Sequence, residues 1–514
     1  MVKAVEFLPT IRYWEGPAFQ LIISCLVGVF LFILNKVLIG SIALLIIALC
    51  LLLFLILYKR SSYQTSLQRI FYLTLLAIPF AWFAEFQTAP TRALTHGITL
   101  QDTELRIFSP SAGSLESELT FEGKVQGCDG YWYDVLLKLP NDSLIPPKYH
   151  YGAIAKATLD LSSILAIKDE GYQKYLLSEG YEAIGNIHSL SSLESMANPP
   201  IKSRLKSFRG KLIAHFEDTS SKELTLEQKG LIYALCLGDR SHLPRVVKES
   251  FTSSGVAHIL AVSGFHLGVI FAFLSSILNH ILPRYRHRYW KYSLLMIGLF
   301  TYTLMSGAST ATVRALIMSM IILVARMLNR PTDPIQLLSL TLLIFLISNP
   351  YSIWSIGLML SISAVWGIYV FLPIFREYFR TQIKALQYVF NIILVSISAQ
   401  LGVLPFLFLY FGSASFSFIW SNIPLVILSA LLIPLALIAL LLNLITGSLP
   451  HFAIKILSWL SNGMIEVTHF FAQSQGNIQY RFDFPLLILY FLFLIILHSW
   501  LYRKANQHYI NRLS

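Results

Sequence analysis

Two histidines and a serine stand inside an apolar run, and they are the residues of this chain most able to do chemistry. His258, Ser263, Gly264 and His266 lie within AHILAVSGFHLGVIFAF (257–273). Polar side chains at membrane depth are costly, so they usually face a cavity, a pathway or one another. A lone membrane histidine often makes only a helix–helix hydrogen bond, but two within this short run, beside Ser-Gly, favour a functional site.

Hydrolysis and metal binding are the first chemistries to weigh for these residues. The segment AVSGF (261–265) differs from the GxSxG nucleophile elbow. His258 and His266 are eight residues apart rather than four, so they do not share a helix face as zinc ligands in HExxH do. The four cysteines are scattered without a CxxC pair. The sequence therefore predicts no catalytic residues, no metal site and no cofactor.

Charged residues add to the candidates on both sides of this run. Asp239 and Arg240, after Gly238, end an apolar run that is too short to span a membrane. Arg314 stands about one turn into a later span, after the small polar residues of 306–310. Its side chain could snorkel to the membrane surface, or it could line a path for phosphates, for which arginine is well suited.

The composition shows what kind of protein must position these residues. Of 514 residues, 55% are hydrophobic and 13% are charged, against about 25% charged in soluble domains, and the mean hydropathy is +0.63. Runs of about 20 apolar residues can cross a bilayer, and they predict a polytopic α-helical membrane protein of about 12 spans. The expected spans are 18–35, 38–58, 70–88, 256–282, 289–306, 309–328, 335–348, 352–373, 387–411, 416–443, 452–472 and 484–502.

Basic loops predict the orientation of these spans. Loops that stay in the cytoplasm are enriched in Lys and Arg, which also accounts for the net charge of +12 without nucleic acid. Both termini are then cytoplasmic, and the polar stretch 89–205 lies outside the membrane. The basic clusters are Lys59, Arg60 and Arg69; Arg284, Arg286, Arg288 and Lys291; Arg326 and Arg330; Arg376, Arg380 and Lys384; and Arg503, Lys504 and Arg512.

The outer stretch predicts a small β domain. Alternating apolar and polar residues in 119–125, 131–139 and 153–159 are typical of half-buried strands. Several short strands in about 100 residues fit an OB-fold-like barrel. The domain is mildly acidic, which does not favour a basic DNA-binding groove. We expect at least two of the three aromatics at 131–133 to pack in its core.

A basic amphipathic helix is expected after the barrel, over 201–216. It could lie on the outer membrane surface or form a basic collar that attracts a polyanion, and the two interpretations are compatible. The domain plan is 1–88 for N-terminal spans, 89–200 for the outer domain, 201–230 for this helix and a linker, 231–475 for a second transmembrane domain, and 476–514 for a last span and basic tail. The basic residues of the helix are Lys202, Arg204, Lys206, Arg209 and Lys211.

Several motifs together resemble the ComEC family of competence DNA channels. The most specific is GVAHILAVSGFH (255–266), which follows LGDR (237–240). The segment 164–187 is similar to the end of that family's outer OB-like domain. Nearly the whole chain matches in order. The remaining matches are SGA (306–308), Arg314-Ala315, Asn349-Pro350, GLMLS (357–361), and Leu404-Pro405 near Phe411-Gly412.

The resemblance implies an inner-membrane channel that admits single-stranded DNA during natural transformation. Asp239, Arg240, His258, Ser263, Gly264, His266 and Arg314 are then candidates for the channel and its gate. It also implies a DNA receptor on the outer face, a separate nuclease and a cytoplasmic helicase-like motor, besides membrane lipids.

Many members of that family carry a metallo-β-lactamase-like domain, but this sequence has no HxHxDH pattern and no GxxxxGK[ST] loop. We therefore expect a channel without its own nuclease or ATPase. The alternative is a secondary transporter of a small anionic or lipid-linked substrate, and a third interpretation is an intramembrane hydrolase.

Overall fold

The computed structural model of the chain describes most of the sequence after its first 97 residues. The predicted spans 18–35, 38–58 and 70–88 therefore lie outside the described residues. What is described forms two compact units. The barrel unit comprises Ile98–Ser207 and Asp333–Ser355, and the helical unit comprises Phe208–Thr332 and Ile356 onward. The described residues are 98–110, 118–128, 130–140, 153–220, 223–282, 288–379, 381, 383–415, 417–473, 477–480 and 482–513.

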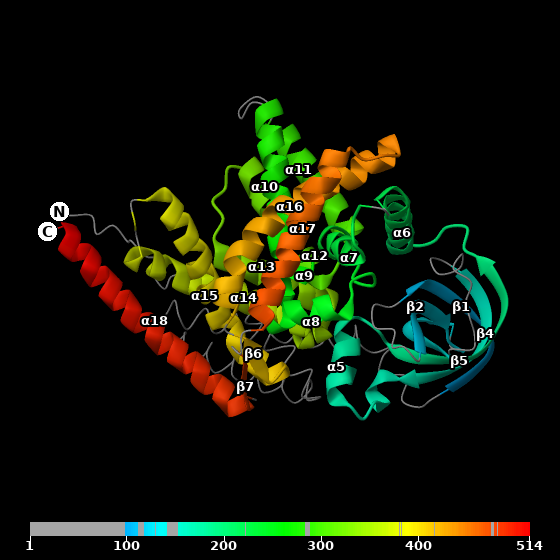
Figure 1. The fold of residues 1–514 in the computed structure, drawn as a ribbon. Helices are drawn as coiled ribbons and strands as arrows, with labels where there is room; N and C mark the ends of the chain where they lie inside the picture. The colour runs from blue at the N-terminus through cyan, green and yellow to red at the C-terminus, as the bar shows by residue number, and fades with distance from the viewer. Residues whose placement is uncertain are drawn as a thin grey trace, which may run out of the picture. The chain divides into compact units, whose positions relative to one another are not determined.

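Five strands close into a barrel in the order β1-β2-β3-β5-β4 (Figure 1). All neighbours are antiparallel except β3 and β5, which run parallel. A five-stranded Greek-key barrel of this kind is the OB-fold, so the predicted small β domain is confirmed, while its place outside the membrane stays a prediction. The strands are β1 Ile98–Pro110, β2 Glu118–Gln126, β3 Trp132–Pro140, β4 Ala153–Ser163 and β5 Ala183–Ser195.

The barrel core follows from alternation along the strands. In β4 every second side chain is buried, from Ala153 to Leu161. The expectation that two of three neighbouring aromatics belong to this core was wrong. Tyr133 is buried, but Tyr131 is 42% exposed, and Trp132 lies half-buried under the Arg106 guanidinium, 4.0 Å from its ring centre. Alternation places Tyr131 and Tyr133 on one side, but Tyr131 precedes the strand and escapes its core.

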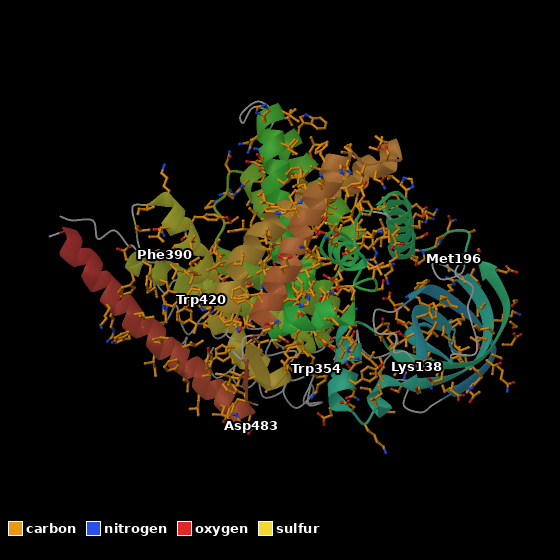
Figure 2. All side chains as sticks on the ribbon, in the orientation of Figure 1. Lys138, Met196, Trp354, Phe390, Trp420 and Asp483 are labelled. Carbon is orange, nitrogen blue, oxygen red and sulfur yellow. The ribbon has the colours of Figure 1, made fainter. Side chains whose placement is uncertain are left out.

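A segment distant in sequence completes the barrel unit. Helix α13 (Pro334–Ser348) leads into the 3₁₀ helix η4 (Pro350–Trp354), which packs against α5 (Glu170–Ser178). Asn349 Nδ2 donates to the Leu177 carbonyl at 2.9 Å. Tyr351 shares a small core with Leu177, and Trp354, labelled in Figure 2, lies under the Lys174 ammonium.

Long apolar helices build the helical unit, and among the described residues five of them are long and apolar enough to cross a membrane. The expected number of about twelve spans stays a prediction. Apolar side chains cover their outer surfaces, as with Trp420 (labelled in Figure 2), which is 62% exposed. The five are α10 Gly264–Ile281, α12 Thr310–Met327, α14 Ile356–Tyr378, α15 Lys384–Tyr410 and α16 Phe418–Thr446. The others are α6 Ile201–Ser220, α7 Leu226–Leu237, α8 Arg245–Ser253, α9 Ala257–Leu260, α11 Arg288–Met305, α17 His451–Ala472 and α18 Phe484–Leu513.

Small residues let α14 and α15 pack with their backbones close together. A Cβ atom on Gly402 would lie 2.0 Å from the Ser363 carbonyl oxygen, and one on Gly367 would lie 2.3 Å from that of Ser398. Close approach at small residues is the usual basis of helix association within membranes. This pair therefore holds one side of the helical unit in a fixed antiparallel arrangement.

Candidate functional site

The expected span 256–282 is interrupted where its polar residues stand. The short helix α9 ends at Leu260, and α10 begins only at Gly264. Ser263 is the N-cap between them, with an extended backbone. A serine at this position satisfies the free N–H groups of a helix start, so the same residues that mark the motif also break the helix.

His266 is held by this cap. Its Nδ1 accepts from the Ser263 backbone N–H at 3.3 Å and lies 3.2 Å from the Ser263 hydroxyl. Because a backbone N–H can only donate, the neutral ring carries its proton on Nε2. The ring is fully buried, and within the described part of the chain Nε2 has no hydrogen-bond partner. His266 thus offers one buried, unsatisfied donor.

The Ser263–His266 pair has the contact that defines a serine–histidine dyad, with the hydroxyl oxygen 3.2 Å from Nδ1. Capping accounts only for the bond from the Ser263 backbone N–H, however, and among described residues no carboxylate contacts Nε2 to orient the ring. A serine nucleophile needs its histidine held by such a third group. The pair is therefore built for positioning a helix start rather than for hydrolysis.

Three motif segments meet next to this cap. Gly238 ends α7 in the left-handed conformation (φ 69°), and a Cβ there would lie 2.3 Å from the Ser306 carbonyl oxygen and 3.3 Å from Val262. The hydroxyls of Ser309 and Thr312 donate to the Val262 carbonyl at 3.3 and 3.2 Å. The residues around 238, 262 and 306–312 are thus in direct contact, and α10 and α12 begin side by side.

Asp239 is fixed at the same turn. Its Oδ1 accepts from the Ser241 backbone N–H at 3.0 Å and from the Ser241 hydroxyl. Arg209 of α6 lies 3.5 Å from the other carboxylate oxygen and donates to the Leu237 carbonyl at 3.1 Å. Burial raises the pKa of the Asp239 carboxyl, but the Ser241 hydrogen bonds and the Arg209 charge outweigh it and hold this pKa below its usual range.

The other sequence candidates are distributed around this turn. Arg240 and His258 are exposed, and both lie within electrostatic reach of His266. Ser263 is half-buried and Gly264 is exposed. The structure therefore brings these candidates to one end of α10. At that end, exposed Arg240 and His258 lie near the buried His266.

Arg314 lies in the first part of α12, next to Ala315, whose Cβ would lie 3.5 Å from a Cβ on Gly264 at the start of α10. Arg314 is 1% exposed and is the largest fully buried side chain of the described residues. Its Nη2 donates to the Gly357 carbonyl at 2.7 Å, and Nε and Nη1 have no partner in the described chain. Arg314 does not snorkel to a surface. Instead it presents two unsatisfied donors inside the helical unit.

The basic residues of α6 do not form one solvent-facing collar. Lys206 pairs with Glu122 at 3.3 Å, and Arg204 donates to Asn198. Arg209 is used at the Asp239 turn, and Lys211 is exposed. The side chain of Lys202 is not among those described. Sequence reasoning placed Arg209 on a surface because helical periodicity shows which face is basic, but not what that face contacts.

Ser241 and Thr312 are site residues that sequence reasoning missed, while Ser309 and Gly357 stand in motifs that it noted without giving these two residues a role. Ser309 was recognisable in principle, because a serine just before an apolar helix is an N-cap signal. Among described residues no group of three or more His, Cys, Asp or Glu side chains could hold a metal ion. What this site offers is donors: His266 Nε2, the Arg314 guanidinium and the starts of two helices, which carry partial positive charge. Such a set suits an anion.

Comparisons with known proteins show which family the chain that carries this site resembles. A family model described as "Competence protein" matches residues 235–504. ComE operon protein 3 of Bacillus subtilis is 27% identical over 232 residues, which cover 44% of this chain and 28% of that protein. Recombination protein 2 of Haemophilus influenzae is 25% identical over 339 residues, or 63% of this chain and 40% of that protein. The chain thus matches less than half the length of these curated relatives, and no solved structure matches it.

Proposed function

Because this chain belongs to the competence protein family, as its motifs indicate, and is an integral membrane protein, we propose that it forms an inner-membrane path for single-stranded DNA. DNA carries a phosphate charge at every nucleotide. Its passage through a bilayer needs a water-filled route with polar or cationic walls. Both termini are proposed to be cytoplasmic, and the barrel is proposed to form an outer vestibule.

The observation that carries this proposal is the set of donors at the starts of α10 and α12. His266 and Arg314 keep buried N–H groups without partners among described residues. An unsatisfied buried donor costs about 1–3 kcal/mol, so several of them together favour the binding of a ligand that accepts hydrogen bonds. Passing phosphate oxygens would accept these bonds transiently. Exposed Arg240 would attract the strand by its charge, and exposed His258 would offer a neutral ring N–H at the same end of α10.

The remaining parts of an uptake machine are proposed to come from partners. We propose that strand removal depends on a separate nuclease, pulling on a cytoplasmic helicase-like motor, and delivery on a DNA receptor outside. A chain with this role acts as a channel rather than as an enzyme.

His258→Ala tests the proposal in a naturally competent host whose own gene is deleted. The host is complemented with the full chain and given fluorescent, genetically marked DNA. We expect transformants to fall at least tenfold while labelled DNA accumulates outside the inner membrane and the protein level is unchanged. His280→Ala, at the other and exposed end of α10, is the matched control and should transform normally.

Normal transformation by His258→Ala at an unchanged protein level would contradict the site assignment. A growth or accumulation defect in deleted cells that were never given DNA would instead favour the transporter of a small anionic or lipid-linked substrate. The two readouts are independent, because transformation and growth are scored on the same strains with and without DNA.

A further inference from the structure

A pocket with one polar end lies between α14 and α15. It is a largely open groove of about 770 Å³, within the range of about 300–1,000 Å³ typical of small-molecule sites. Ile368, Leu372 and Pro373 form an apolar wall along α14. Arg376 in the last turn of α14 and Asn391 near the start of α15 lie toward the connecting loop. An apolar wall that leads to a polar end suits an amphipathic ligand.

The polar end has an arginine fixed in place. Arg376 Nε donates to Asn391 Oδ1 at 3.1 Å, which orients the guanidinium. Its two Nη groups have no partner in the described chain, and the side chain is exposed. A guanidinium fork matches the oxygens of a phosphate group. Lys384, exposed in the first turn of α15, adds positive charge nearby.

Residue types typical of a membrane–water interface lie beside the pocket. Tyr378 and Phe379, which follow Arg376 closely, are 40% and 51% exposed. The Tyr378 hydroxyl donates to the Leu501 carbonyl, so the end of α18 lies at the same level. There Lys504 sits 4.3 Å from the ring centre of Trp500. Aromatic rings together with Lys and Arg mark the ends of membrane helices at the headgroup level.

We propose that this pocket binds an anionic phospholipid of the phosphatidylglycerol class. Its phosphate is held by Arg376, and an acyl chain lies along Ile368 and Leu372. Basic pockets between membrane helices on the cytoplasmic side recognise acidic headgroups, and the apolar wall would have no role for a DNA phosphate. The buried Glu377 also lines the pocket and already has a partner within the protein. The positive charges of Arg376 and Lys384 therefore favour an anionic ligand.

The test uses the full chain purified in a neutral detergent. Its thermal midpoint is measured with added short-chain phosphatidylglycerol or phosphatidylcholine. We expect phosphatidylglycerol to raise the midpoint more than phosphatidylcholine does, and Arg376→Gln to lose at least half of that difference. Arg330→Gln removes an equal charge from the exposed end of another helix segment and should keep it. Asn391→Leu keeps the Arg376 charge but frees its orientation, and should also lower the difference.

Three outcomes would overturn the proposal. Equal midpoint shifts with the two lipids would remove the headgroup specificity. Equal losses in Arg376→Gln and Arg330→Gln would show only bulk attraction of charge. An Arg376-dependent shift with a single-stranded oligonucleotide, and not with lipid, would make DNA the occupant. None of these depends on DNA uptake in cells, so the DNA path can fail or succeed separately.

Discussion

Replacement of Arg314 by Met distinguishes a functional role of this arginine from a structural one. The Arg314 guanidinium is buried in α12, where one arm donates to the Gly357 carbonyl and two N–H-bearing nitrogens have no partner among described residues. Met is unbranched and of similar length, so it can fill the same space without the charge. The substitution should therefore stabilise the protein while it abolishes DNA entry.

The size of the effect follows from the hydrogen bonds of Arg314. Removing two unsatisfied donors should gain about 2–6 kcal/mol, and losing one bond from a charged group should cost about 1.5–3 kcal/mol. The net is a stabilisation of about 2 kcal/mol. It is measured as a rise in the denaturation midpoint of the full chain in detergent, beside transformation frequency in complemented cells. A purely structural arginine would show the opposite stability change.

Arg326→Met is the matched control, because Arg326 lies in the last turn of the same helix and is exposed. It should leave both stability and transformation near wild type. The argument is refuted if Arg314→Met lowers the midpoint, since the unsatisfied donors would then have partners that stabilise the fold. It is equally refuted if the substituted protein transforms cells at the wild-type frequency, because no passing anion would then need Arg314.

Further expectations concern backbone contacts and pH. Gly238→Ala should destabilise the full chain by more than Gly447→Ala does. Both glycines have a positive φ, which costs about 1–3 kcal/mol for a non-glycine residue, but only at Gly238 would a new Cβ clash with the Ser306 carbonyl oxygen. Equal denaturation midpoints for the two variants would contradict this contact. Gly402→Ala should also destabilise the full chain by more than Gly447→Ala does, because its Cβ would force α14 and α15 apart. The efficiency of crosslinking between cysteines introduced into these two helices should fall in this variant. The depressed pKa of Asp239 means that its stabilising contribution is complete above its ordinary pKa of about 3.9 and is lost as pH falls through the lower folded value. The stability difference between wild type and Asp239→Asn should therefore shrink from pH 7 to pH 3, and a constant difference would show that the carboxylate charge contributes nothing.

Periodicity and composition were enough to predict three of the five barrel strands and most helices of the described chain, but not β1 and β5. Alternation in β4 placed Ala153 and Leu159 inside, and the apolar run of α16 needs no tertiary information. They left the break at Ser263 undecided, because a Ser-Gly pair within a span permits either close approach of helices or a break. An uninterrupted apolar run predicts one helix, whereas the cap formed by Ser263 and His266 starts a new one. Local hydrogen bonds of this kind override hydropathy, and a single sequence does not reveal them.

The fate of charged side chains was the least predictable part. Arg209 and Lys206 are both on a basic helix face, yet both are used inside the protein, at Asp239 and at Glu122. Arg314 had two open interpretations, and the buried one holds. Which partner a long side chain reaches depends on segments far away in sequence, and net charge or periodicity carries no information about them.

The closure of the barrel has a consequence for how other molecules can recognise it. Each strand in the order β1-β2-β3-β5-β4 has a neighbour on both sides, since β4 pairs back with β1. A sheet with an exposed edge can recruit an extended peptide as an additional strand, or stick to a second copy of itself. This barrel leaves only short stretches of such edge, for example on β1 before Leu105, where its pairing with β2 has not begun. A molecule that binds this domain is therefore recognised mainly by side chains and connecting loops, so its selectivity can change by substitution while the backbone stays the same.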